Sequence, residues 1–221
     1  MTTDPQRLLL ATLAIVLWLG LIALIVLSRR ATARKARSAA DALATGDDPV
    51  LVAFASQTGF AEELAWMTAR ALSEAGTGAR VTSLGDLTPD DLRATRRALF
   101  IASTTGEGDA PDGASGFVRR FMAEPASLGG LDYGVLALGD TSYAQTWAFG
   151  RALDDWLGRS DARPLFDRVE VDDGETGAIR HWQHQLAAVT GSAVAADWAP
   201  PAFDRWRLVA RTHLNPGSPG G

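Results

Sequence analysis

The sequence predicts an α/β protein with a doubly wound, five-stranded parallel sheet, because short apolar runs alternate with amphipathic helical patterns from residue 49 onward. Three of these apolar runs end in polar, glycine-bearing loops. The expected strands lie near residues 50–55, 80–84, 97–103, 132–138 and 164–171, and the expected helices near 60–75, 114–124, 147–159 and 176–190.

The first apolar run, residues 50–55, fits a strand that is buried on both faces. It ends in Ser56-Gln57-Thr58-Gly59, and a helical pattern with apolar residues on one face follows at once. A strand, a polar turn and a helix form an anion cradle, since the free N–H groups of the first helical turn point at the anion. Ser56 and Thr58 add hydroxyl donors, and Gly59 allows close backbone approach. An ordinary polar turn is the alternative interpretation.

Two other phosphate-binding patterns are excluded at this position. An ATP-type loop ends in Gly-Lys-Ser or Gly-Lys-Thr, but the single lysine of the chain is Lys35, outside the predicted α/β region. A dinucleotide loop requires Gly-x-Gly-x-x-Gly after the strand, and residues 56–61 do not contain it. The first loop therefore indicates a different kind of anion site.

The second and third loops follow the strands near 98–102 and 135–138. They read Ser103-Thr-Thr-Gly-Glu-Gly-Asp-Ala-Pro111 and Gly139-Asp-Thr-Ser-Tyr-Ala-Gln-Thr-Trp147. Open α/β sheets bind ligands at the carboxyl ends of their strands, so all three loops should share one edge. In this order and spacing they resemble the flavodoxin-like FMN domain of diflavin reductases, over about residues 49–190. The nearest branch is the NADPH–sulfite reductase flavoprotein subunit, followed by cytochrome P450 reductase.

The resemblance implies the strand order 2-1-3-4-5 for the sheet. It also implies an FMN site with three parts. The first loop would hold the phosphate, the second would follow one edge of the isoalloxazine ring, and the third would stack on the ring. The implied cofactor-binding residues are Ser56, Gln57, Thr58, Gly59, Phe60, Ala61, Ser103, Thr104, Thr105, Gly106, Glu107, Gly108, Leu138, Gly139, Asp140, Thr141, Ser142, Tyr143, Trp147 and Asp173.

Two of these residues depart from the family pattern. Phe60 stands where the family usually has Thr or Asn, which removes a polar side chain from the phosphate end but leaves the backbone donors. Thr105 stands where P450 reductases carry an aromatic residue and sulfite reductase flavoproteins carry Gln. One stacking partner of the ring is therefore missing, which points away from the P450-reductase branch.

Other implied roles concern the flavin ring. The Gly106 peptide can flip at low cost and turn a carbonyl toward N5 when that atom is protonated. Glu107 and Asp109 add negative charge that would make the reduced flavin a stronger one-electron donor. Tyr143 matches the stacking tyrosine of the family, while Trp147 is also expected to begin the following helix and pack on the core.

A transmembrane helix is expected to precede this domain. Residues 8–27 form an uncharged, largely apolar run that is long enough to cross a bilayer as a helix. Residues 1–7 form a short N-terminus before it. Five basic residues between 29 and 37 follow the run. They favour a signal anchor over a cleaved signal peptide and place everything after residue 28 in the cytoplasm. Residues 28–48 read as a basic, Ala-rich tether. The predicted location is the cell inner (cytoplasmic) membrane, crossed once.

Charge and composition restrict the partners. Residues 38–221 hold 15 of the 21 basic and 25 of the 26 acidic residues, a formal net charge of −10. An acidic surface favours a basic protein partner and disfavours nucleic acid, although charge that serves only solubility is the alternative. The chain has no cysteine, so disulfides and thiolate sites are excluded. His181 and His184 are expected at the surface of the last helix, whose core positions include Ile179 and Trp182.

The C-terminal segment, residues 191–221, reads as a linker followed by a strand-like alternation. It resembles the beginning of the FAD-binding module that follows the FMN domain in diflavin reductases. In that family NADPH reduces FAD, FAD reduces FMN, and FMN reduces a haem or iron–sulfur partner. The chain shows no nicotinamide fingerprint, so it should not oxidise NADPH alone.

The sequence therefore favours a membrane-anchored FMN domain that relays single electrons from an FAD/NADPH-binding reductase module to a basic haem or iron–sulfur acceptor. No catalytic base, nucleophile or metal is required, since the chemistry belongs to the flavin. Two alternatives stay open: a flavodoxin-like quinone reductase that uses bound FMN directly, and a cofactor-free, membrane-tethered interaction domain. The FAD-module-like tail opposes the first, and only Phe60 and Thr105 favour the second.

Overall fold

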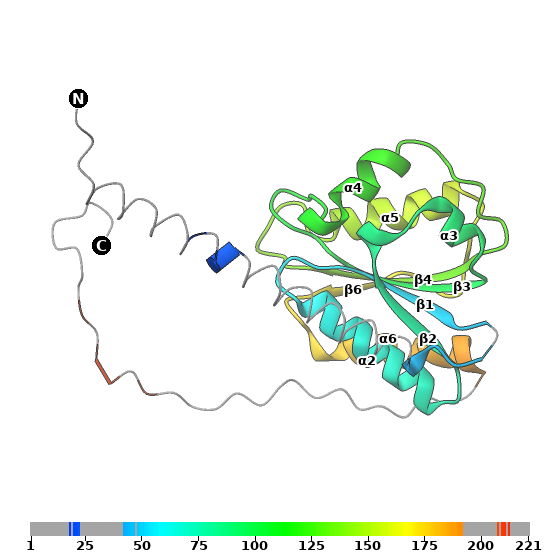
Figure 1. The fold of residues 1–221 in the computed structure, drawn as a ribbon, viewed down its shortest axis with the longest axis horizontal. Coiled ribbons are helices and arrows are strands. Elements are labelled where there is room, and N and C mark those ends of the chain that lie inside the picture. Colours follow the sequence, from blue (N-terminus) through cyan, green and yellow to red (C-terminus); the bar gives the residue numbers. More distant parts are fainter. Residues whose placement is uncertain are drawn as a thin grey trace.

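The computed structural model of the chain describes residues 18, 20–22, 42–46, 48–191, 207, 209, 210 and 212. In this part strands and helices alternate along the chain (Figure 1). The elements are β1 (Val50–Ala55), α2 (Phe60–Glu74), β2 (Ala79–Ser83), a 3-10 turn (Leu84–Asp86), α3 (Pro89–Arg93), β3 (Arg97–Ser103), α4 (Asp112–Phe121), β4 (Asp132–Gly139), α5 (Ala148–Arg159), β5 (Arg163–Pro164), β6 (Val169–Asp172) and α6 (Thr176–Thr190).

The strands form one parallel sheet in the order β2-β1-β3-β4-β5, and β6 also pairs with β4. The strand order expected from the sequence is confirmed. The central strands β1, β3 and β4 are almost wholly buried, as their unbroken apolar runs predict. Their carboxyl ends lie at the same edge, because parallel strands all run in one direction.

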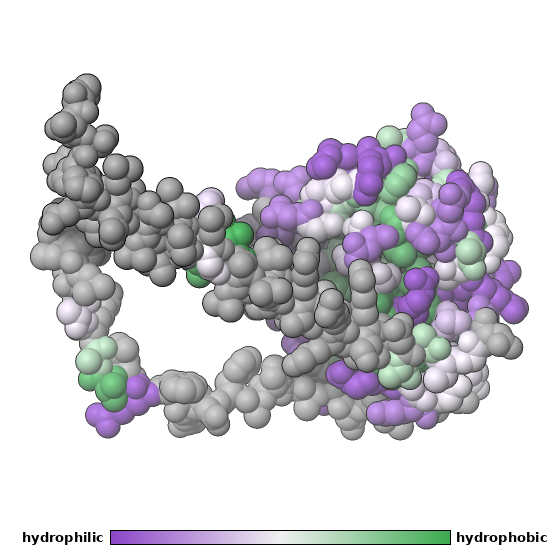
Figure 2. Space-filling model, viewed as in Figure 1, coloured by the Kyte–Doolittle hydropathy of each residue, from purple (hydrophilic) through white to green (hydrophobic). Residues whose placement is uncertain are grey.

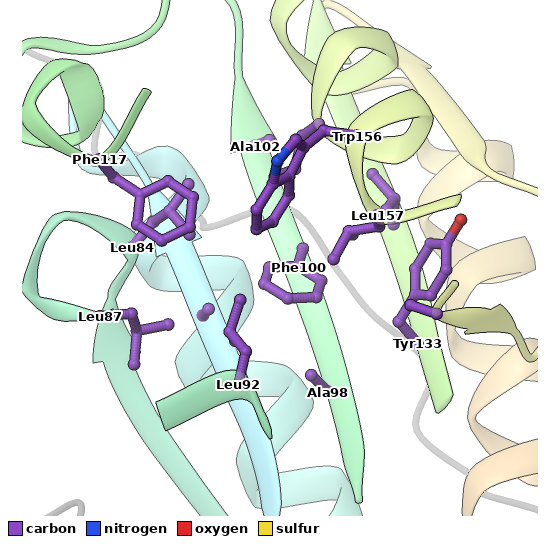
Figure 3. Packing of buried hydrophobic residues seen from close by; sticks show 14 of the residues in the cluster. Leu84, Leu87, Leu92, Ala98, Phe100, Ala102, Phe117, Tyr133, Trp156 and Leu157 are labelled. Carbon is purple, nitrogen blue, oxygen red and sulfur yellow. The ribbon is translucent and has the colours of Figure 1, made fainter. Parts of the chain in front are cut away.

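Helices cover both faces of the sheet, with α3, α4 and α5 on one side and α2 and α6 on the other (Figure 1). On the first side, Phe117 and Trp156 meet edge to face with ring centroids 5.5 Å apart, and both point toward Phe100 of β3 (Figure 3). On the second side, Trp182 is fully buried and donates from Nε1 to Thr68 Oγ1 over 3.0 Å. Each layer thus has its own apolar core.

The predicted helical pattern near the carboxyl end of the domain is confirmed in detail. Ile179, Trp182, Leu186 and Val189 are all buried on the inner face of α6. His181 and His184 are exposed on the outer face of the same helix. The outer surface of the domain is largely hydrophilic on the face that Figure 2 shows, in keeping with its acidic composition.

The prediction of one continuous fifth strand at 164–171 is wrong. The structure has two short strands, β5 and β6, which pair with opposite ends of β4. Phe166 lies between them, and its Cζ would be only 2.4 Å from a Cβ added to Gly134. The ring therefore occupies space that the absent Gly134 side chain leaves free and meets Trp182 edge to face at 5.6 Å. The packing of this half-buried ring accompanies the break between β5 and β6, before which Leu165 N–H still donates to Tyr133 O over 2.7 Å.

Other differences are smaller. The sequence reading missed α3, which begins with a capping box between Thr88 and Asp91 and has Pro89 in its first turn. The helix predicted at 114–124 is α4, which begins two residues and ends three residues earlier than expected. Trp147 was expected to be the first residue of the next helix, but it is the N-cap of α5. Helix ends commonly shift by one or two residues.

The predicted membrane span at 8–27 lies outside the described residues, apart from residues 18 and 20–22. Among the helices that are described, none combines the length and the apolar character that a bilayer crossing needs. The tether at 28–48 is described only at 42–46 and 48, and the predicted module start at 191–221 only at 191, 207, 209, 210 and 212.

Alanine substitution at two helical glycines should change the free energy of unfolding in opposite directions. A Cβ at Gly150 in α5 would lie 2.4 Å from Ala137 Cβ in β4, whereas one at Gly116 in α4 would meet only the Arg120 guanidinium, at 3.5 Å. We expect Gly150→Ala to lower the free energy of unfolding by about 1–3 kcal/mol through overpacking. The control Gly116→Ala should raise it by about 0.5–1 kcal/mol. Urea denaturation followed by circular dichroism measures both, and equal stability of the two variants would contradict this packing.

Candidate functional site

A cavity of about 670 Å³ lies at the carboxyl ends of β1, β3 and β4. Four loops of the described chain enclose it: those that follow these three strands and the turn after β6. The lining residues are Gln57, Thr58, Phe60, Glu63, Ser103, Thr104, Thr105, Gly106, Leu138, Gly139, Asp140, Tyr143, Gln145, Thr146, Asp173 and Gly174. The edge at which the sequence placed the site is therefore hollow.

The first loop ends in an open helix N-terminus. Gly59 takes a left-handed conformation (φ 101°), and its N–H donates to Ser56 Oγ over 3.0 Å. The first intrahelical bond runs from Glu63 N–H to Gly59 O, and no side chain caps the helix. The N–H groups of residues 60–62 are left for another acceptor, so this end of the cavity suits an anion.

The second loop is a tight turn closed on itself. Thr105 N–H donates to Asp109 O over 2.9 Å, and Asp109 N–H donates to Thr105 O over 2.8 Å. Inside the turn, Gly106 and Gly108 have φ angles of 52° and 110°, which a side chain would strain. A Cβ at Gly108 would also lie 2.9 Å from Gln145 Cβ, so the second loop packs closely on the third.

Thr104 carries a polar atom that the protein does not satisfy. Its Oγ1 is buried and has no hydrogen-bond partner, while its N–H continues the sheet pairing by donating to Leu138 O over 2.9 Å. Thr104 lines the cavity. Because a buried hydroxyl without a partner costs free energy, this atom fits a site whose ligand supplies the missing bond.

The third loop is ordered by carboxylates. Ser142 donates to Asp140 Oδ1 from its N–H (2.8 Å) and from its Oγ (2.5 Å). The side-chain bond and then the backbone bond favour the charged carboxylate and hold the pKa of Asp140 below its ordinary value. The loop presents Tyr143, a residue that is 58% exposed at the edge of the cavity. An exposed ring in an ordered loop is placed to stack on a planar ligand.

The carboxyl end of β6 holds the third loop in place. Asp172 accepts from Thr141 N–H (2.8 Å) and Thr141 Oγ1 (2.7 Å). Trp147, which has a left-handed backbone (φ 58°), donates from Nε1 to Val171 O over 2.9 Å. The Arg151 guanidinium lies 5.2 Å from the centre of the indole ring. Trp147 therefore attaches the loop to the sheet edge and does not line the cavity.

Two more contacts connect the first loop to its neighbours. Gln57 Nε2 donates to Asp112 Oδ2 over 3.3 Å, and Asp112 N–H donates to Gln57 Oε1 over 3.1 Å. On the other side, a Cβ at Gly174 would lie 3.5 Å from Phe60 Cζ, so the phenyl ring faces the bare backbone of the turn after β6. The first loop is thus bonded to the start of α4 and lies close to the turn after β6.

The structure brings most of the sequence-predicted site residues to the cavity. Twelve of them line it: Gln57, Thr58, Phe60, Ser103, Thr104, Thr105, Gly106, Leu138, Gly139, Asp140, Tyr143 and Asp173. The remaining eight do not line it: Ser56, Gly59, Ala61, Glu107, Gly108, Thr141, Ser142 and Trp147. Several of these eight shape the loops instead, through the bonds described above. That any of the twenty residues contacts FMN stays a prediction.

Four lining residues were not predicted: Glu63, Gln145, Thr146 and Gly174. Glu63 lies one helical turn after Phe60, so the i, i+3 spacing of a helix starting at residue 60 could have indicated it. Gly174 directly follows Asp173 and has a φ angle of 72°. Nothing in the sequence distinguished Gln145 and Thr146 from other polar residues of the third loop.

A doubly wound sheet with a polar cavity at the carboxyl ends of its strands defines a class of proteins that bind phosphate-bearing cofactors there. The sequence profile of the Flavodoxin family matches residues 52–182, and the chain belongs to this family. A cysteine-to-alanine mutant of flavodoxin from Pseudomonas aeruginosa has a similar solved structure, with a TM-score of 0.56, 28% sequence identity, and coverage of 67% of this chain and 99% of that one.

Two curated relatives are longer proteins. The sulfite reductase (NADPH) flavoprotein alpha-component of Vibrio cholerae is 30% identical over 188 residues, which cover 82% of this chain and 30% of that protein. Methionine synthase reductase of Caenorhabditis elegans is 37% identical over 148 residues, covering 64% of this chain and 22% of that protein. The chain therefore spans less than a third of their length. The cofactor prediction is confirmed for the family, since flavodoxin-fold proteins bind FMN.

The unpaired Thr104 hydroxyl should respond to FMN. We expect Thr104→Val to weaken FMN binding roughly threefold to tenfold, the factor that one net hydrogen bond contributes. The control Thr104→Ser keeps the hydroxyl and should bind within about twofold of the unaltered chain. Titration of the apoprotein with FMN, followed by flavin fluorescence, measures the dissociation constants. If Thr104→Val bound FMN as tightly as Thr104→Ser, the hydroxyl would have no role in the site.

Proposed function

We propose that this chain is the FMN-binding electron-transfer domain of a diflavin-reductase system. It receives electrons from an FAD/NADPH-binding module and passes them singly to a haem or iron–sulfur acceptor. The observation that carries this proposal is the cavity at the sheet edge, which joins an uncapped helix N-terminus to the buried, unpaired hydroxyl of Thr104. These two features suit a ligand that has an anionic group at one end and hydrogen-bonding groups on its ring system, as FMN has.

The residues around the cavity fit FMN in three parts. The N–H groups of residues 60–62 and the Thr58 side chain would bind the phosphate. Thr104 and the turn at Gly106 would bind the polar edge of the ring system, and Tyr143 would stack on its face. When bound, FMN supplies reversible one- and two-electron chemistry. Because Tyr143 is exposed, a ring stacked on it would lie where a partner can approach.

The sulfite reductase type of reductase is supported by the relatives. Two proteins that resemble the chain are named an NADPH sulfite reductase flavoprotein and a methionine synthase reductase, and both extend far beyond the matched part. We place the FAD and NADPH sites in a module outside residues 49–190. The chain itself then needs only to accept electrons and hand them on.

The charge of the sheet edge supports a basic acceptor. The four edge segments 56–63, 103–112, 139–147 and 172–176 contain nine carboxylates and no basic residue. A basic protein would be steered toward the cavity by this field, and the association rate would fall as salt is raised. Membrane attachment through residues 8–27 is part of the proposal and rests on their apolar character alone.

A reduction experiment on the full chain tests the electron-relay proposal. The purified protein, loaded with FMN, should be bleached stepwise by dithionite and should stay oxidised with NADPH alone. A separately purified FAD/NADPH reductase module should restore reduction by NADPH. Absorbance between 350 and 700 nm, roughly the range of flavin bands, follows each step. Direct reduction by NADPH would overturn the proposal in favour of a quinone-reductase type of protein.

Fractionation of cells tests the attachment. We expect the full chain to sediment with membranes and to resist extraction at high salt and at alkaline pH, because an apolar span of this length inserts stably. A chain that lacks residues 1–28 is the matched control and should remain in the supernatant. Release of the full chain by salt would show that basic residues, not a span, hold it to the membrane.

A further inference from the structure

The last residue of the third loop has a backbone conformation that its side chain disfavours. Trp147 is the N-cap of α5 and lies in the left-handed region, with φ 58° and ψ 10°. Bulky side chains rarely adopt this region, and such a conformation persists where surrounding contacts determine it. The residue before it, Thr146, lines the cavity and donates from Oγ1 to Tyr143 O over 2.7 Å and to Asp140 O over 3.0 Å. The placement of Trp147 is therefore passed on to the loop that carries Tyr143.

The Trp147 indole is held by two different elements. Its Nε1 donates to Val171 O of β6 over 2.9 Å. The Arg151 guanidinium, one turn further along α5, lies 5.2 Å from the centre of the ring, which is within the range of a cation–π contact. The edge of the sheet and the first turn of α5 thus fix the ring together.

The guanidinium is itself fixed by β6. Arg151 donates from Nε to Glu170 Oε1 and from Nη2 to Glu170 Oε2, both over 2.8 Å. A bidentate bond of this kind sets the plane of the guanidinium as well as its position. Arg168 donates from Nε to the same carboxylate over 3.1 Å and is also paired with Asp154. Glu170 is therefore held from two sides, and it directly precedes the residue whose carbonyl binds the indole.

We propose that Arg151 is a positioning residue for flavin binding. Oriented by Glu170, it holds the Trp147 indole against β6 and so keeps Tyr143 placed for stacking on the flavin ring. The described lining of the cavity includes none of Trp147, Arg151 and Glu170, so their effect on a flavin is indirect. A loop that is ordered before the ligand arrives loses less entropy on binding. The inference rests on the FMN site proposed above.

Titration of the full-length apoprotein with FMN tests the inference. We expect Arg151→Met to raise the FMN dissociation constant roughly fivefold to tenfold, because the third loop must then be ordered on binding. Arg151→Lys keeps a charge near the indole but loses the bidentate bond, so its effect should be about twofold to threefold. The matched control is Arg163→Met. It removes another bidentate pair, in which Arg163 donates to Asp132 over 2.8 and 3.0 Å at the opposite end of β4. It should leave the FMN dissociation constant within about twofold.

A double-mutant cycle separates positioning from a general effect on the fold. If Arg151 acts through Tyr143, adding Arg151→Met to Tyr143→Ala should change the FMN dissociation constant by less than about twofold. The same fivefold to tenfold change in both backgrounds would overturn the role of Arg151, and so would an unchanged dissociation constant in Arg151→Met itself. FMN binding by the unaltered chain would leave the proposed function standing in either case. If the unaltered chain bound no flavin, the proposed function would fail and this inference with it.

Discussion

The parallel pairing of β1, β3 and β4 is the constraint on which the rest of the structure depends. These strands are buried on both faces, so each backbone N–H and C=O must find its partner in a neighbouring strand. The register fixes Ala55 beside Ala102 and Ser103 beside Leu138. The three loops consequently leave the sheet at one level, and the pairing even continues from Thr104 N–H to Leu138 O. The cavity exists because the strands end together.

A second feature keeps the loops from collapsing into that cavity. Two hydrogen-bonded pairs, Gln57 with Asp112 and Thr141 with Asp172, join neighbouring segments around the cavity. The side chains of Gln145 and Phe60 lie close to the bare backbones of Gly108 and Gly174. Each uses local chemistry, such as a carboxylate that accepts two donors or a glycine that admits a neighbouring side chain. A site ordered before the ligand arrives loses less entropy on binding. Tyr143 stays exposed at the edge of this site.

Negative charge is distributed unevenly over the surface of the domain. Carboxylates gather at the loops around the cavity, while several arginines are paired elsewhere, as in the Arg151–Glu170 bond at 2.8 Å. The side-chain bond from Arg151 is the main cause that lowers the pKa of Glu170, so this part of the surface stays ionised and neutralised. The cavity edge has no such compensation. In the proposed function, this asymmetry would steer a basic partner toward the cavity.

The sequence alone indicated the alternation of strands and helices, apart from α3 and the split fifth strand, and the three polar loops, because hydrophobic periodicity is a local property. The resemblance that those loops carry added the strand order of the sheet. It also indicated twelve of the sixteen cavity-lining residues. Tertiary structure alone decided the split of the fifth strand, which accompanies the packing of Phe166 over Gly134. It likewise decided that Trp147 binds Val171 O, that Thr104 Oγ1 is buried without a partner, and that Phe60 lies close to Gly174. These contacts join residues far apart in the chain, and no periodicity along the sequence records them.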